Sequence, residues 1–188
     1  MVCIAVLTRT LFHVGSDSMM KIQAFTFILV TTIFNAVDSG RNLALRKPAN
    51  ASSTYTGSYQ IWASNVVDGS PSGDFNDRTC HSGENGDLNP WWQVDLQAVY
   101  RISRVQIVGR SDGRTEWLHD FYIEMYDGNP TVTVGVQPKL CHFYKGVFKP
   151  TTQDIKCDSV VSGRILDAPN IKTTSVAGMK VRGPRMQN

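Results

Sequence analysis

The sequence predicts an all-β domain of the sandwich or barrel type. Short segments in which apolar and polar residues alternate are separated by clusters of Gly, Asn, Asp, Pro and Ser, which is typical of antiparallel strands joined by turns. No segment after residue 41 carries a helical stripe of apolar residues longer than about two turns. The loops are long, above all residues 69–89, and long loops on a β-scaffold commonly carry binding sites.

Three segments show the alternation most clearly. The apolar residues of Trp92–Leu96 share one face of an extended chain, and residues 105–108 continue the same pattern. In residues 121–126, Phe, Ile and Met alternate with Tyr, Glu and Tyr, and the turn sequence Asp127–Pro130 follows. We therefore expect strands at these three places.

Length and charge limit the functional classes. The chain has 188 residues, of which 41% are hydrophobic and 19% charged, which suits one globular domain with a leader. The formal net charge is +3, and a nearly neutral domain without a basic stripe does not indicate a nucleic acid or an anionic membrane surface as the partner. We find no Ser/His/Asp arrangement, phosphate loop or catalytic metal cluster in the sequence, so no enzyme is expected.

The first 39 residues resemble a secretory leader. From Met20, a single lysine precedes an apolar run, Ile22–Phe34, and small residues follow around Ala36 and Ser39. The run is short for a membrane span, which needs about 20 residues. We expect residues 1–39 to be removed, which predicts a secreted protein whose mature chain has no membrane span; an uncleaved anchor is the alternative.

In a secreted protein, cysteines can form disulfides and a suitable asparagine can be glycosylated. Cys3 leaves with the leader, so Cys80, Cys141 and Cys157 remain. A bridge between Cys141 and Cys157 would close a hairpin of about 15 residues and stabilise the fold by roughly 3 kcal/mol, which leaves Cys80 unpaired. Asn50 begins an Asn-Ala-Ser glycosylation sequon.

The character of the chain changes after Arg164. Residues 165–188 are polar and basic and show no strand alternation that we recognise. We therefore predict that these residues form a tail that is disordered or foreign to the domain, and place the folded domain at residues 41–164.

Four segments in order are similar to the F-type lectins, the fucolectin and tachylectin-4 group related to coagulation factor 5/8 type C (discoidin) domains. The segments are Asn42–Ala49, Ala63–Gly69, Asn89–Leu96 and Arg110–Asp112. The resemblance implies a discoidin-like antiparallel jelly-roll β-sandwich with binding loops at one end and a calcium ion beneath them. It also implies a hairpin disulfide at the positions of Cys141 and Cys157.

The resemblance further implies a site for fucose-type glycans. Adjacent hydroxyl groups suit charged donors such as Arg and His, and the methyl group of a 6-deoxy sugar suits an aromatic wall. Arg110 matches the first basic position of the family, Asp112 would hold its guanidinium, and Phe75 is the candidate contact for the methyl group.

Two positions depart from the family pattern. His81 directly follows Cys80, whereas the family has one residue between its cysteine and its site histidine. Trp117 stands where the family has a second basic residue, so either Arg114 substitutes for it or Trp117 stacks on a sugar ring.

For calcium, the resemblance points to loop oxygens, which are the ligands that this hard cation prefers. The family completes the site with a Cys-Glu pair in its last strand, and that Cys also bridges to the one matching Cys80. We find neither residue in this chain. We therefore expect the normal last strand to be truncated or replaced and calcium binding to be weakened. The candidate ligands are Asn65, Asp68, Ser70 and Thr79.

These observations favour a secreted lectin for fucosylated glycans. Single sugar sites bind weakly, so multivalency through a homo-oligomer would fit this function. The alternative is an adhesion or extracellular-matrix module that keeps the fold and has lost sugar binding, because fold alone does not determine function.

Overall fold

The computed structural model describes residues 42–57, 61–169, 175–176 and 178–182. All of them belong to the unit Ser39–Asn188. The predicted leader, residues 1–39, lies outside the described residues. In the part of the chain that is described, no helix has the length and apolar character needed to cross a membrane.

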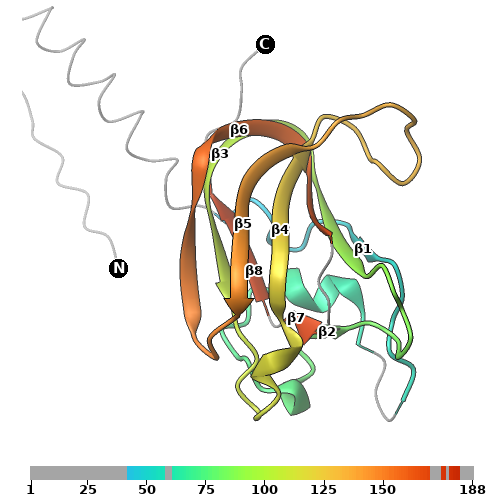
Figure 1. The fold of residues 1–188 in the computed structure, drawn as a ribbon, viewed down its shortest axis with the longest axis vertical. Helices are drawn as coiled ribbons and strands as arrows, with labels where there is room; N and C mark the ends of the chain where they lie inside the picture. The colour runs from blue at the N-terminus through green and yellow to red at the C-terminus, as the bar shows by residue number, and fades with distance from the viewer. Residues whose placement is uncertain (1–41, 58–60, 170–174, 177, 183–188) are drawn as a thin grey trace, which may run out of the picture. The chain divides into compact units, whose positions relative to one another are not determined.

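The described residues form antiparallel strands joined by loops and short 3-10 turns, which confirms the all-β prediction (Figure 1). Two strands are long, β3 (Trp91–Val108) and β6 (Thr152–Pro169). The shorter strands are β1 (Ala49–Ala51), β2 (His81–Ser82), β4 (His119–Tyr126), β5 (Lys139–Val147), β7 (Ser175–Val176) and β8 (Gly178–Arg182).

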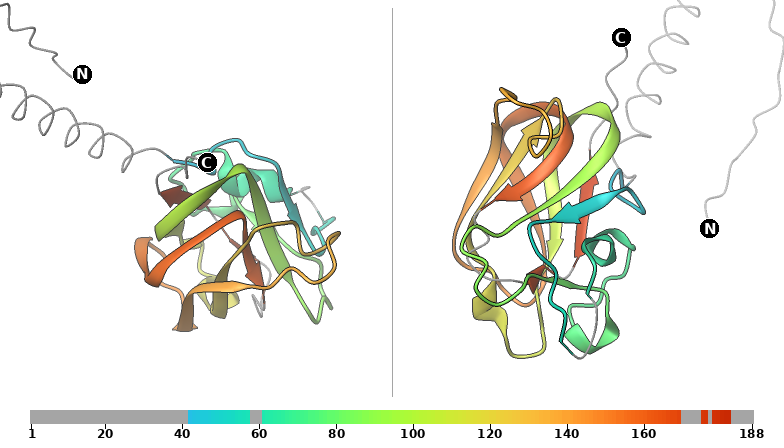
Figure 2. Two further views of the ribbon diagram at one scale, coloured as in Figure 1. Left: turned by 90° about the horizontal axis from the view of Figure 1, so that it is seen from above. Right: turned by 90° about the vertical axis from the view of Figure 1, so that its right-hand side faces the viewer.

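The two long strands connect the layers of a sandwich. The larger sheet has the order β1-β3-β6-β4-β5, with β8 also paired to β3, while β2 and β7 form a separate pair. The first part of β3 pairs with β1 and with the end of β6, whereas its last part, Arg104–Val108, pairs with β8 and the start of β6. Figure 2 shows β3 and β6 arching together from one layer to the other.

A bulge lets β3 bend without leaving the sheet. The register between β3 and β6 shifts between Asp95 and Tyr100, and Gln97 has a φ of 64° with its N–H donating to Asp95 Oδ1 at 2.7 Å. Extra residues at a bulge increase the local bend. The strands predicted at 92–96 and 105–108 are therefore parts of one strand, and the predicted strand at 121–126 lies in β4.

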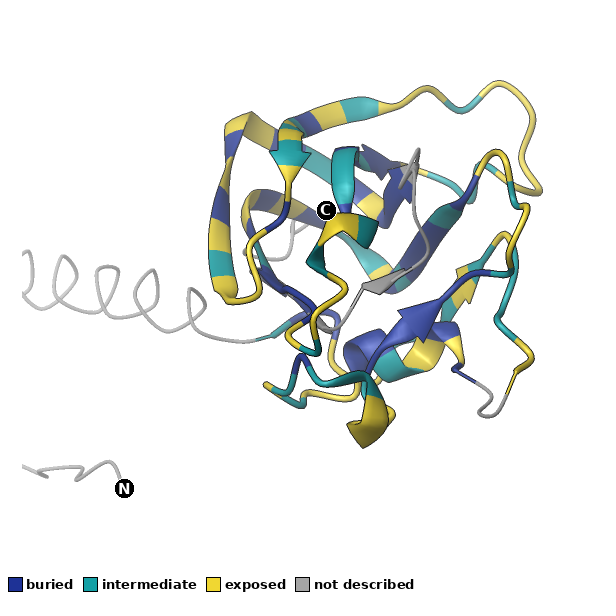
Figure 3. Cartoon of the chain, turned by 60° about the horizontal axis from the view of Figure 1, so that its bottom comes forward, coloured by how far each residue is buried: buried dark blue, intermediate teal, exposed yellow. Residues whose placement is uncertain are grey.

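The core lies between the layers, where alternate residues of the long strands point inward. Trp92, Phe121, Ile123 and Met125 are almost completely buried, and the indole N–H of Trp92 donates to the carbonyl of Ala63 at 2.9 Å. A buried tryptophan needs such a partner for its one donor. Figure 3 shows the buried strand residues surrounded by exposed loops.

The predicted disulfide is confirmed. Cys141 in β5 is bonded to Cys157 in β6, so it joins an edge strand of the sheet to a central one. Cys80 is free and buried, and this burial raises the pKa of its thiol to about 11. A buried thiol that stays protonated is a poor nucleophile.

The prediction of a disordered tail from residue 165 is wrong for the described residues. Residues 165–169 continue β6, and β8 pairs with the last part of β3 over Arg104–Val108. Met179 and Val181 are buried in the main core, and the carbonyl of Val181 accepts a hydrogen bond from the N–H of Leu43 at 2.8 Å. A terminal strand is thus present. Residues 170–174, 177 and 183–188 lie outside the described part of the chain.

The sequence pattern did not predict β8, because this strand is short and has an unusual composition. β8 has five residues, in which Gly178, Lys180 and Arg182 alternate with the apolar residues Met179 and Val181. Gly and Lys are depleted in strands, so the local preference is weak. Pairing with β3 and burial of one face supply the stability that the local sequence lacks.

We expect Val181→Ala to lower the free energy of unfolding by about 2 kcal/mol, because it removes fully buried methyl groups and leaves a cavity. Urea denaturation followed by tryptophan fluorescence measures the change. Val160→Ala is the matched control, since the Val160 side chain is 54% exposed. Equal stability of the two variants would show that β8 does not belong to the cooperative core.

Candidate functional site

Arg110 is the centre of the candidate site. It follows the end of β3 and is only 6% exposed, although it is a charged residue. Asp112 accepts from its guanidinium through both carboxylate oxygens, from Nε to Oδ1 and from Nη2 to Oδ2, the latter at 2.7 Å. This hydrogen bonding lowers the pKa of Asp112. A bidentate pair of this kind fixes the plane of the guanidinium.

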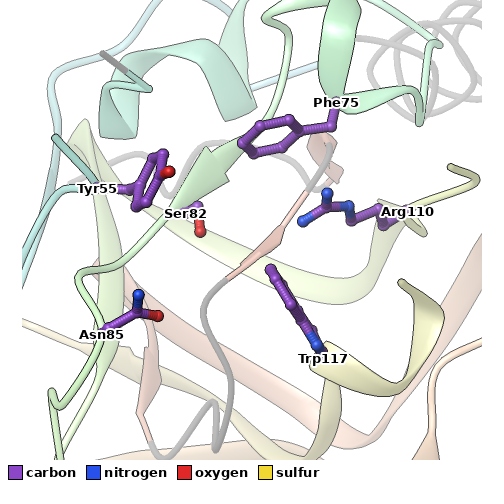
Figure 4. A pocket seen from close by; sticks show the side chains of 6 residues that line it. All are labelled: Tyr55, Phe75, Ser82, Asn85, Arg110 and Trp117. Carbon is purple, nitrogen blue, oxygen red and sulfur yellow. The ribbon is translucent and has the colours of Figure 1, made fainter. Parts of the chain in front are cut away.

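Two aromatic rings cover Arg110. The guanidinium carbon lies 4.2 Å from the ring centroid of Phe75 and 4.8 Å from that of Trp117. Figure 4 shows the three side chains as a stack, with the guanidinium between the rings. Cation–π contacts with both rings compensate for part of the water that a buried guanidinium loses. Arg114, which is exposed, lies 5.4 Å from the Trp117 ring.

Two glycines allow the loops that carry these side chains to meet. The N–H of Ser111 donates to the carbonyl of Gly73 at 2.9 Å. A Cβ on Gly73 would lie 2.2 Å from the carbonyl oxygen of Gly109, and one on Gly109 would lie 2.0 Å from that of Lys149. Only glycine tolerates such close backbone approach. This packing brings the loop before Phe75 against the residue that precedes Arg110.

Short 3-10 turns hold the two aromatic residues. Phe75 begins η3 (Phe75–Asp77), where the Asp74 carboxylate accepts from the N–H of Asn76 at 2.8 Å. Trp117 ends η4 (Thr115–Trp117). A side-chain acceptor at the start of such a turn stabilises it, so Phe75 is held by local geometry as well as by its contact with Arg110.

The stack forms one wall of a cavity of about 180 Å³. Tyr55, Ser82 and Asn85 line it together with the three stacked residues, and Figure 4 shows these three on the other side of the opening. The N–H of Tyr55 donates to the carbonyl of Ser82 at 2.8 Å, which joins two loops of the far wall. Beneath the cavity, Ile61, Cys80 and Val108 form a small apolar cluster against Tyr55 and Phe75.

The predicted residue His81 does not line this cavity. It is buried, with its Nδ1 at 2.8 Å from the carbonyl oxygen of Ile61. Since a carbonyl only accepts, Nδ1 carries the hydrogen. Burial lowers the pKa of His81, which favours the neutral ring. We correct the expected placement: neighbouring residues of a strand face opposite sides, so β2 turns Ser82 toward the cavity and His81 away.

Three lining residues were not predicted from the sequence. Ser82 is separated from Cys80 by one residue, which is the spacing of the family's site histidine, so this signal was available. Tyr55 and Asn85 lie in irregular loops and reach the cavity only through the packing of those loops, so no local pattern indicates them.

The four candidate calcium ligands lie in one loop region. Asn65 Nδ2 donates to the carbonyl of Arg78 at 2.9 Å, and Asp68 Oδ1 accepts from the N–H of Ser70 at 2.7 Å. Thr79 Oγ1 donates to the carbonyl of Ser72 at 3.1 Å. The side-chain oxygens of these four residues suit a hard cation such as calcium, but Asp68 is the single carboxylate among the four. The described residues contain no cluster of three or more His, Cys, Asp or Glu side chains suited to a metal ion.

The sequence and the fold of this chain are similar to those of known proteins. Residues 65–167 match the family model of the F5/F8 type C, NedA-like, galactose-binding domain. The chain is 32% identical over 126 residues to a fucolectin of Anguilla anguilla, which covers 65% of this chain and 77% of that protein.

Solved structures agree. A fucolectin (f-lectin) from the serum of striped bass, Morone saxatilis, has a TM-score of 0.68 and 25% identity; the match covers 77% of this chain and about half, 49%, of that one. A fucose binding module of Streptococcus pneumoniae has a TM-score of 0.60 at 22% identity over 77% of this chain and 96% of that one, which supports the fold alone. By sequence and fold together, this chain belongs to the F-type lectin family of F5/F8 type C-like, galactose-binding domains.

Proposed function

We propose that this domain binds a neutral sugar of the fucose type in the Arg110 cavity. The observation that carries the proposal is the stack of Phe75, Arg110 and Trp117 with Asp112 behind it. It places a fixed hydrogen-bond donor beside apolar surface in a cavity of about 180 Å³. Relatives with 32% and 28% identity to this chain are named fucolectins, which supports a carbohydrate as the ligand.

Each part of the cavity suits one part of such a sugar. The planar guanidinium of Arg110 has several N–H donors in fixed directions, which match two adjacent hydroxyl groups. The rings of Phe75, Trp117 and Tyr55 offer apolar surface for a methyl group or for the C–H face of a pyranose. Ser82 and Asn85 add short neutral groups that both donate and accept.

The charge balance favours a neutral ligand. Asp112 compensates the charge of Arg110 within a bidentate pair, and Arg110 is the only cation among the described residues that line the cavity. An acidic sugar would therefore meet a guanidinium that already has its counter-ion, and would lose hydration without full compensation. Neutral hydroxyl groups avoid this cost.

We expect Arg110→Ala to weaken L-fucose binding at least about 10-fold, because hydrogen bonds from a charged donor contribute about 1.5–3 kcal/mol. Trp117→Ala should weaken it by a similar factor through lost stacking. Calorimetric titration of the folded proteins measures both effects. Arg101→Ala, an exposed position in β3, is the control that should bind as the wild type does.

The alternative function is that of an adhesion or matrix module with the same fold. Two observations favour it: Ser82 lines the cavity in place of the predicted histidine, and Trp117 supplies a ring where the family has a basic residue. A well-folded wild type that gives no response to L-fucose or to fucosylated oligosaccharides would reject the lectin proposal and leave this function.

Calcium is the structural cofactor that we propose for the loop of Asn65, Asp68, Ser70 and Thr79. A calcium ion bound there would connect the two ends of the segment 65–79, which contains Phe75. With Asp68 as the single carboxylate among these ligands, binding should be weak, because calcium affinity rises with the number of charged ligands.

We expect calcium to raise the melting temperature of the wild type and a chelator to lower it, because a ligand that binds only the folded state stabilises it. Asp68→Asn should abolish the response, whereas Asp158→Asn, which changes an exposed carboxylate of β6, should retain it. Differential scanning fluorimetry measures the shift. A wild type that melts at the same temperature with and without calcium would contradict the proposal.

An extracellular location fits the chemistry of the domain. The Cys141–Cys157 disulfide is of the kind that persists in oxidising compartments, and Asn50 of the sequon is exposed in β1. A glycan at Asn50 and assembly into homo-oligomers that increase avidity for fucosylated surfaces belong to the same proposal.

A further inference from the structure

A second polar cluster lies on the face of the sheet opposite to the core. Gln93 of β3 and Asp167 of β6 are directly paired residues. Their neighbours Trp92, Val94, Leu166 and Ala168 point into the core, so Gln93 and Asp167 point the other way. Both are nevertheless buried, at 4% and 6% exposed. Asn129, in the loop between β4 and β5, contacts Gln93.

This pair contains two buried acceptor atoms without donors. Gln93 Oε1 and Asp167 Oδ1 have no hydrogen-bond partner. Rotating the Gln93 amide by 180° does not resolve the problem. Its Nε2 donates to Asn129 Oδ1 at 3.3 Å, and that oxygen accepts from the N–H of Thr131 at 2.9 Å. Exchanging the two ends of the Gln93 amide would therefore place two oxygens together.

The surrounding charges oppose a negative Asp167. Glu124 of β4 is directly paired with it and accepts from the hydroxyl of Tyr126 at 2.8 Å. The cations on neighbouring segments have acidic partners of their own: Arg164 bonds to Asp95, and Lys139 to Asp127. An ionised Asp167 would thus add a second negative charge beside Glu124 in a place with little water, which is costly.

We propose that Asp167 is protonated in the folded protein at mildly acidic pH and that its O–H donates to Gln93 Oε1. One proton, taken from the solvent, then satisfies both unpaired acceptors. The hydrogen bond joins β6 to β3 and, through Gln93 and Asn129, to the loop between β4 and β5. The cluster therefore makes the attachment of this loop depend on pH. Figure 1 shows the loop between β4 and β5 at the top of the domain and the loop between β3 and β4 at the bottom.

The titration of the site supports this assignment. Burial, and secondly the charge of Glu124, raise the pKa of Asp167 to about 7. In the unfolded chain an Asp titrates near about 3.9. Between these two pH values the folded state binds one more proton than the unfolded state. The proton therefore stabilises the fold at mildly acidic pH, and this stabilisation is lost as the pH rises through about 7.

The test compares the wild type with Asp167→Asn, whose amide imitates the protonated carboxyl and supplies a permanent donor. Thermal unfolding is measured between about pH 5 and pH 8, with Asp154→Asn, an exposed residue of the same strand, as the matched control. The melting temperature of the wild type and of Asp154→Asn should fall as the pH rises through about 7. That of Asp167→Asn should fall less, so that the difference between its melting temperature and that of the wild type grows up to about pH 7 and is constant above it.

Parallel pH profiles of the wild type and Asp167→Asn would overturn the proposal. Infrared difference spectroscopy gives a second readout that does not depend on stability. We expect a protonated carboxyl band from the wild type at about pH 6 that is absent in Asp167→Asn, and its absence from the wild type counts against the proton. A metal ion that raises the melting temperature of the wild type but not of Asp167→Asn would assign the cluster to a cation instead.

Discussion

The pairing of β3 with β6 is the constraint on which the rest of the structure depends. These two strands run beside each other from Trp91 to Val108 and bend together at the bulge near Gln97. Each therefore contributes to both layers, and the core is closed by the strands themselves. Because β3 ends at Val108, Arg110 lies in the loop that follows it at the end of the sandwich. The Cys141–Cys157 disulfide holds β5 to the other long strand, β6.

The candidate site depends on a charge that is buried without being isolated. Asp112 supplies the counter-ion for Arg110, and Phe75 and Trp117 cover the two faces of its guanidinium. Such a group has little freedom to lose when a ligand binds, so less binding energy is spent on ordering it. The same rings that replace water around the cation also provide the apolar surface of the cavity. One arrangement therefore fixes the donor and shapes the pocket.

Three buried polar side chains illustrate three ways to satisfy a polar group away from water. Arg110 has a charged partner. His81 has a backbone carbonyl and a lowered pKa, which favours the neutral state. Asp167 has a raised pKa and a neighbouring unpaired acceptor, an arrangement that a bound proton completes. Each arrangement follows from the local geometry. A buried polar group without a hydrogen-bond partner would lower the free energy of unfolding by a large part of the small total.

The sequence by itself determined the all-β class and the pairing of Cys141 with Cys157, because alternation and cysteine spacing are local properties. It also singled out Phe75, Arg110 and Trp117, which the fold brings into one stack. Only the tertiary structure decided that residues 178–182 form a strand, since their stability comes from β3 and not from their composition. It also decided that Ser82 rather than its neighbour lines the cavity, because a shift of one residue along a strand moves a side chain to the opposite face.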